Sequence, residues 1–102
     1  MTDRPDAILQ AGAKTFAERN AAYGDSYISH GSVMEALFPD GVVLKTPSDH
    51  NRFSIFLLIT MKMSRYANNF AKGGHQDSIH DIMVYASMLE SLDEQRTAPV
   101  QD

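Results

Sequence analysis

The chain contains no cysteine, and it has little positive charge for a protein that would bind nucleic acid. The absence of cysteine excludes disulfide bonds and thiolate metal ligands, and it fits a reducing compartment. Lys and Arg number 9 against 13 Asp and Glu, and the resulting net charge of −4 disfavours nucleic-acid partners, which need a positive surface. A long apolar run is also lacking, because Ser54 and Thr60 interrupt the segment from Phe53 to Met61. We therefore expect a cytoplasmic protein without a membrane partner.

The composition that is present is that of one folded domain. The chain has 102 residues, of which 43% are hydrophobic and 22% charged. We expect residues 1–95 to form a single all-α domain, and residues 96–102, which include Pro99, to form a flexible C-terminal tail. A short helical chain has little interior for its apolar surface, which predicts a homo-oligomer, more specifically a dimer rather than a tetramer.

Apolar residues recur at helical spacing in four segments, residues 5–22, 27–37, 47–71 and 77–92. Gly24, the turn at residues 38–41 and the pair Gly73-Gly74 separate these segments. Thr46-Pro47 is typical of a helix start, because threonine caps a helix and proline suits its first position. The pattern predicts a small four-helix bundle in which the long third helix is central, longest and most buried.

Two acids near the start of the fourth segment are candidate metal ligands. Asp77 and Asp81 are four residues apart, so both project from one face of a helix. Two carboxylates at this spacing can hold a hard cation, which makes Mg²⁺, or Mn²⁺ in its place, the candidate cofactor. Alternatively, Asp77 is an N-cap and Asp81 a solvated acid. Asp81 precedes the apolar residues Ile82 and Met83, and an acid at the edge of a core needs a partner.

Two cations on the third segment are candidate phosphate ligands. Lys62 and Arg65 are three residues apart and follow an apolar run, where cations are unusual unless they face a cleft or a carboxylate. A lysine and an arginine on one face can bind phosphates. The alternative is a structural salt bridge to Asp77 or Asp81, and both interpretations can hold together. The short turn at Gly73 predicts an antiparallel hairpin of the last two helices.

Counting from Gly73 gives that hairpin an expected register. Arg65 and Asp81 are equally distant from this residue, whereas Lys62 is level with Val84 and Tyr85. We therefore expect Arg65 and Asp81 to lie at the same height and to form an ion pair if helix rotation lets them face each other.

The segment from Arg19 to Asp25 ends the first helix with an aromatic residue, a glycine and an acid. Arg19, Tyr23 and Asp25 could position a base or a ribose, although the same residues make an ordinary turn. The histidines lack the spacing of zinc ligands, and we expect them to be surface or capping residues: His30, His50, His75 and His80.

The order of these elements resembles that of a known family. The resemblance rests on Arg19, Tyr23-Gly24-Asp25, Thr46-Pro47, Lys62, Arg65, Asp77-Ser78, Asp81 and Tyr85-Ala86, and it covers about Ile8 to Leu92. The chain resembles the MazG-like all-α NTP pyrophosphatases, in a branch of small phage and prophage proteins associated with nucleotide modification. This resemblance implies an oligomeric helical bundle that cleaves (d)NTPs to the monophosphate and pyrophosphate with Mg²⁺. It also implies that Asp77 and Asp81 hold the metal and that Lys62 and Arg65 meet the phosphates.

The chain departs from the family in its acids. Active members carry a Glu-x-x-Glu motif on an earlier helix, whereas the first two segments here offer Glu18 and Glu35, seventeen residues apart. Glu18, Glu35 or Asp25 could complete the metal shell or act as a base, and the catalytic residues stay unassigned.

Two functions from different classes therefore remain. One is a protein that binds, and when active hydrolyses, nucleoside triphosphates. The other is a non-catalytic helical phage accessory module that acts through oligomerisation or a host partner. An enzyme would bring Asp77, Asp81 and a third acid within ligand distance of one metal. A module would leave these acids apart or paired with Lys62 and Arg65.

Overall fold

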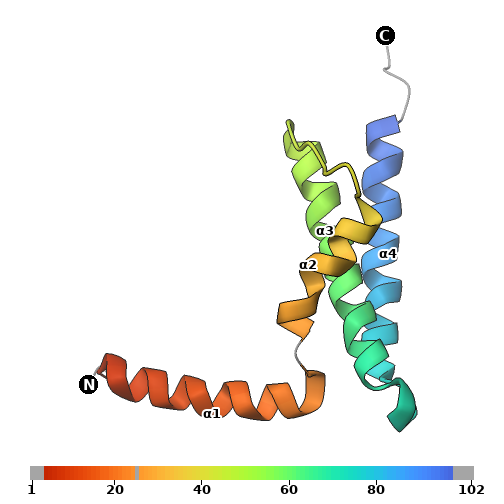
Figure 1. Cartoon of the computed structure of the whole chain (residues 1–102). Coiled ribbons are helices and arrows are strands. Elements are labelled where there is room, and N and C mark those ends of the chain that lie inside the picture. The colour runs from red at the N-terminus through yellow and green to blue at the C-terminus, as the bar shows by residue number, and fades with distance from the viewer. Residues whose placement is uncertain (1–3, 25, 98–102) are drawn as a thin grey trace.

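The computed structural model describes residues 4–24 and 26–97, with the backbone alone at positions 22, 23, 26, 27, 96 and 97. Four α-helices follow one another in this part of the chain: α1 (Pro5–Tyr23), α2 (Ser26–Leu37), α3 (Pro47–Asn68) and α4 (Gln76–Thr97). A 3₁₀ turn, η1 (Phe70–Lys72), joins α3 to α4 (Figure 1). The described residues contain no strand, which confirms the all-α class.

The start of α3 is determined by its sequence. The Thr46 hydroxyl accepts a hydrogen bond from the backbone N–H of Asp49 at 3.1 Å. The Asp49 carboxylate in turn accepts one from the backbone N–H of Thr46 at 3.2 Å. This reciprocal capping box, with Pro47 in the first turn, satisfies backbone donors that have no partner within the helix. The helix start predicted at Thr46-Pro47 is confirmed.

The hairpin of α3 and α4 differs from the expectation in its turn and in the lengths of its two helices. α3 ends at Asn68, before the predicted residue 71, because the chain enters the 3₁₀ turn and then the left-handed conformation at Gly73 and Gly74. α4 continues to Thr97, beyond the predicted end at residue 92, and the tail expected from residue 96 is helical at its start. Both helices have 22 residues, so the prediction that the third helix is the longest is wrong.

The packing is centred on α3, which contacts α4 along its length and α2 on another side (Figure 1). Phe38, just after α2, contacts Phe53 and Phe56 of α3 with ring centroids 5.8 and 5.6 Å apart. The apolar run of α3 is nevertheless mostly half-buried, and the fully buried side chains among the described residues are the polar Thr60 and Ser78. The predicted burial of the third helix is thus only partial within one chain.

α1 extends away from the other helices, as Figure 1 shows, and all side chains from position 4 to position 19 are exposed. The radius of gyration is 17.8 Å, against about 13 Å for a compact domain of this length. A single chain therefore packs α2, α3 and α4 together and leaves α1 outside this packing. None of the helices in the described part of the chain is long and apolar enough to cross a membrane.

Candidate functional site

An ion pair between Lys62 and Asp81 joins α3 to α4. The Lys62 ammonium lies 3.0 Å from a carboxylate oxygen of Asp81, and the side chains are 16% and 39% exposed. The lysine stem is therefore largely withdrawn from water, while the carboxylate stays accessible at the edge of the hairpin. An accessible acid beside a sheltered cation is an arrangement that an anionic ligand and its metal can enter.

The structure pairs Asp81 with Lys62, whereas sequence counting placed Arg65 at that height. The chain reverses around the 3₁₀ turn at residues 70–72, which lies before Gly73, the assumed centre of the turn. Because the chain reverses earlier in the sequence, every pairing between α3 and α4 shifts by about one helical turn. The cation paired with Asp81 is therefore Lys62, one turn further from the hairpin end than Arg65. Lys62, which sequence counting placed level with Val84 and Tyr85, thus reaches Asp81.

Arg65 and Asp77 lie on the same two helices, nearer the turn. Arg65 is half-buried, and its backbone carbonyl accepts a hydrogen bond from the Asn69 side chain at 2.8 Å. Asp77 is exposed in the first turn of α4. His75 caps that helix instead of Asp77, because its Nδ1 accepts a hydrogen bond from the Ser78 backbone N–H at 3.2 Å. Asp77 is therefore not the N-cap that one interpretation expected.

The described side chains do not assemble a cluster of three or more metal-ligating groups. Glu18 and Glu35, the acids considered for the metal shell, are exposed on α1 and α2. Asp25, the third acid considered, lies outside the described residues. Within the described part of one chain, Asp77 and Asp81 are therefore not joined by a third acid.

The turn between α1 and α2 lies against the end of α3. A Cβ atom built on Gly24 would lie 3.3 Å from the Asn68 amide nitrogen, so the glycine backbone approaches that side chain closely. Arg19 is exposed on α1, the Tyr23 side chain is not described, and Asp25 lies outside the described residues. The candidate nucleotide-binding segment thus reaches the same hairpin at Asn68, six residues beyond Lys62.

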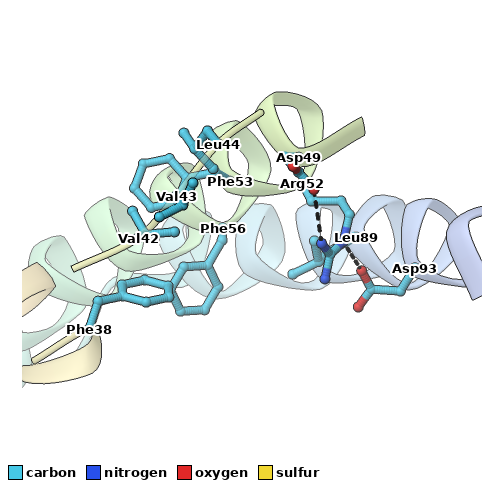
Figure 2. Close-up of a pocket in the computed structure, with 10 residues that line it drawn as sticks. All are labelled: Phe38, Val42, Val43, Leu44, Asp49, Arg52, Phe53, Phe56, Leu89 and Asp93. Atoms are coloured by element: carbon cyan, nitrogen blue, oxygen red, sulfur yellow. Dashed lines mark hydrogen bonds and ion pairs between the residues drawn. The ribbon is translucent and has the colours of Figure 1, made fainter. Parts of the chain in front are cut away.

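Sequence analysis missed a second ion pair of the hairpin. The Arg52 guanidinium lies 2.6 Å from Asp93 of α4 and 4.0 Å from Asp49 of α3. Figure 2 shows these three side chains at the rim of a mostly apolar hollow of about 350 Å³, which Phe53 and Leu89 help to line. The pair was not anticipated because the fourth helix was expected to end at residue 92, before Asp93.

Two histidines also have interactions that sequence analysis did not assign. His30 of α2 lies 2.8 Å from the Thr60 hydroxyl, which itself donates to the Leu57 carbonyl at 2.7 Å. His75 lies 2.6 Å from the Ser78 hydroxyl, in keeping with the expected capping role. The signal for the first contact was the hydroxyl of Thr60 within an apolar run, because a buried hydroxyl requires hydrogen-bond partners.

Comparison with protein-family models, curated proteins and solved structures gives no match.

Proposed function

We propose that the protein binds Mg²⁺-nucleoside triphosphates at the Lys62–Asp81 edge of the α3–α4 hairpin, in the cytoplasm. The observation that carries this proposal is the sheltered ammonium of Lys62 held 3.0 Å from an accessible carboxylate. Lys62 would meet a phosphate oxygen, and Asp81 would turn from the lysine to the metal. Arg65, one helical turn along α3, adds a second cation near this edge.

The acids present fit a binding site for magnesium better than a catalytic one. Mg²⁺ in nucleotide sites is held by one or two carboxylates, with phosphate oxygens and waters as its other ligands. Asp77 and Asp81, four residues apart on α4, can supply such a pair. When bound, the metal would neutralise phosphate charge. Hydrolysis requires in addition a base to activate water, for which Glu18, Glu35 and Asp25 are the candidates.

A second candidate function is a non-catalytic helical module that acts through its own assembly or a protein partner. The observation that favours it is the absence of any fully buried apolar side chain among the described residues. Soluble monomers rarely expose contiguous apolar surface of this kind without a partner for it. Asp81 paired with Lys62, without a third acid beside it in the described part of the chain, is the arrangement expected of a module, and in this alternative the pair serves only to join α3 to α4.

Calorimetric titration with the common NTPs and dNTPs, in Mg²⁺ or Mn²⁺, separates the two functions, while pyrophosphate release reports cleavage. We expect saturable binding that requires the divalent ion and is lost in Asp81→Asn and in Lys62→Gln. If the parent protein binds neither Mg²⁺ nor any nucleotide, the module is the better account.

The chain offers a matched control in its other ion pair. Asp93→Asn removes the negative charge of the Arg52–Asp93 ion pair between the same two helices, at the opposite end of the hairpin. We expect this variant to keep nucleotide affinity within about twofold of the parent. Equal losses of affinity in Asp93→Asn and Asp81→Asn would assign the effect to hairpin stability and reject the proposed site.

A further inference from the structure

The protein exposes far more surface than a compact monomer of its mass. Its accessible area is 8065 Å² for 11.3 kDa, whereas folded monomers of that mass expose about 5,700 Å². The accessible area in excess of a compact monomer is more than about 1,000 Å². A stable protein–protein interface removes about 800 Å² of accessible area from each partner. The chain therefore carries enough uncovered surface for one full interface.

Partly exposed apolar side chains follow α3 and α4 on part of that surface. Ile59 of α3 and Ala86 of α4 line one shallow groove between the two helices. Met63, one turn from Ile59, and Met83, one turn from Ala86, extend this row of side chains toward the hairpin end and are 54% and 60% exposed. At its other end the row meets the apolar hollow of Figure 2, which shares Leu89 and Asp93 with the groove. We call this surface the α3–α4 strip.

α1 has the shape and the chemistry to cover the α3–α4 strip. Its apolar residues Ile8 and Leu9 are more than half exposed, and Gly12 and Ala13 on the next turn are small enough for close helix contact. Its 19 residues correspond to about 28 Å, close to the about 33 Å of the 22-residue α4. The strip is bordered by Glu90 and Glu94, and Arg19 borders the apolar side of α1, so their charges are complementary.

The chain's own α1 does not occupy this strip. The turn at Gly24 is held close to Asn68, and from there α1 runs away from the hairpin (Figure 1). The α1 of another molecule has no such restriction. We propose that two copies of this chain associate by placing α1 of each copy on the α3–α4 strip of the other. The exchange buries both apolar surfaces, and neither Lys62 nor Asp81 lines the groove that it covers.

Cross-linking tests the exchange directly, because the chain has no cysteine of its own. A tagged chain with Ala13→Cys is mixed with an untagged chain with Ala86→Cys and treated with a short bismaleimide. We expect an efficient link between the tagged and untagged chains. Ala7→Cys, on the opposite face of α1, is the matched control and should link poorly. Equal linking from positions 7 and 13 would overturn the proposed contact.

Light scattering on the full chain gives a second, independent test. We expect the parent to have the mass of a dimer, and the double variant Ile8→Gln with Leu9→Gln to shift to the mass of a monomer. Glutamine keeps helix propensity, and circular dichroism checks that helicity is retained. Ala7→Gln with Ala11→Gln places the same side chains on the opposite face and should remain dimeric. A monomeric parent at high micromolar concentration would overturn the proposal, and no nucleotide enters either experiment.

Discussion

At the scale of single residues, the buried hydroxyl of Thr60 in α3 forms a hydrogen bond with His30 of α2 and so joins the two helices. Thr60 is 1% exposed, and its one proton serves the Leu57 carbonyl, so the oxygen accepts from His30 Nε2. Thr60→Val keeps the shape but leaves the histidine without this acceptor. We expect a loss of about 1–2 kcal/mol in the free energy of unfolding, measured with urea.

Ser64→Ala is the matched control for that loss. Its hydroxyl donates to the Thr60 carbonyl at 3.2 Å within the same helix, and no buried group depends on it for a partner. We expect a change within about 0.5 kcal/mol. A Thr60→Val protein as stable as the parent would show that the His30 contact contributes nothing.

Two glycines should respond to alanine with opposite signs. Gly24 has φ 70° and ψ −161°, a conformation that only glycine adopts readily, and it lies against Asn68. We expect Gly24→Ala to lower the free energy of unfolding by about 2 kcal/mol. Gly31 lies inside α2 with no atom near its missing Cβ, so Gly31→Ala should raise that energy by about 0.5–1 kcal/mol. The same sign in both variants, measured by chemical denaturation, would contradict the described turn.

At the scale of elements, local chemistry predicted the helices well and their mutual register poorly. Thr46, Pro47 and Asp49 determine the start of α3 through contacts within four residues, so sequence alone was sufficient. The partner of Asp81 depends on where the chain reverses, and a 3₁₀ turn before Gly73 shifted it by one helical turn. Side-chain spacing describes one helix, whereas a contact between helices also depends on the loop geometry.

The capping box of α3 supplies a prediction at this scale. Thr46→Ala removes the acceptor for the Asp49 backbone N–H and should lower the free energy of unfolding by about 1 kcal/mol. Thr46→Ser keeps the acceptor and should lose much less. Equal losses in the two variants, measured by thermal unfolding, would show that the methyl group matters more than the cap.

At the scale of the whole molecule, stability should depend on protein concentration. The described residues bury no apolar side chain fully, and the proposed exchange of α1 supplies the missing burial only in the assembled state. A partner that binds the folded chain but not the unfolded chain raises the stability of the folded chain by mass action. We therefore expect the Tm to rise between low and high micromolar protein. The Ile8→Gln with Leu9→Gln variant should lose this rise, and a Tm that is independent of concentration in the parent would contradict the assembly.

The Lys62–Asp81 pair has two explanations, a ligand site and a link between α3 and α4, and exchanging the two charges separates them. Each single variant, Lys62→Asp or Asp81→Lys, leaves like charges opposed and should cost at least about 1 kcal/mol of stability. The double variant restores an ion pair, so most of that loss should be recovered, as urea unfolding will show. A restored ion pair does not restore the site, because the ammonium and the carboxylate have changed places.

The most direct test of the proposed function is therefore a calorimetric titration of the Lys62→Asp with Asp81→Lys protein with an Mg²⁺-nucleoside triphosphate that the parent binds. We predict a folded protein of near-parental stability whose affinity has fallen by at least about tenfold, or about 1.4 kcal/mol. Parental affinity in the exchanged protein would show that the pair only joins the two helices, and would contradict the account.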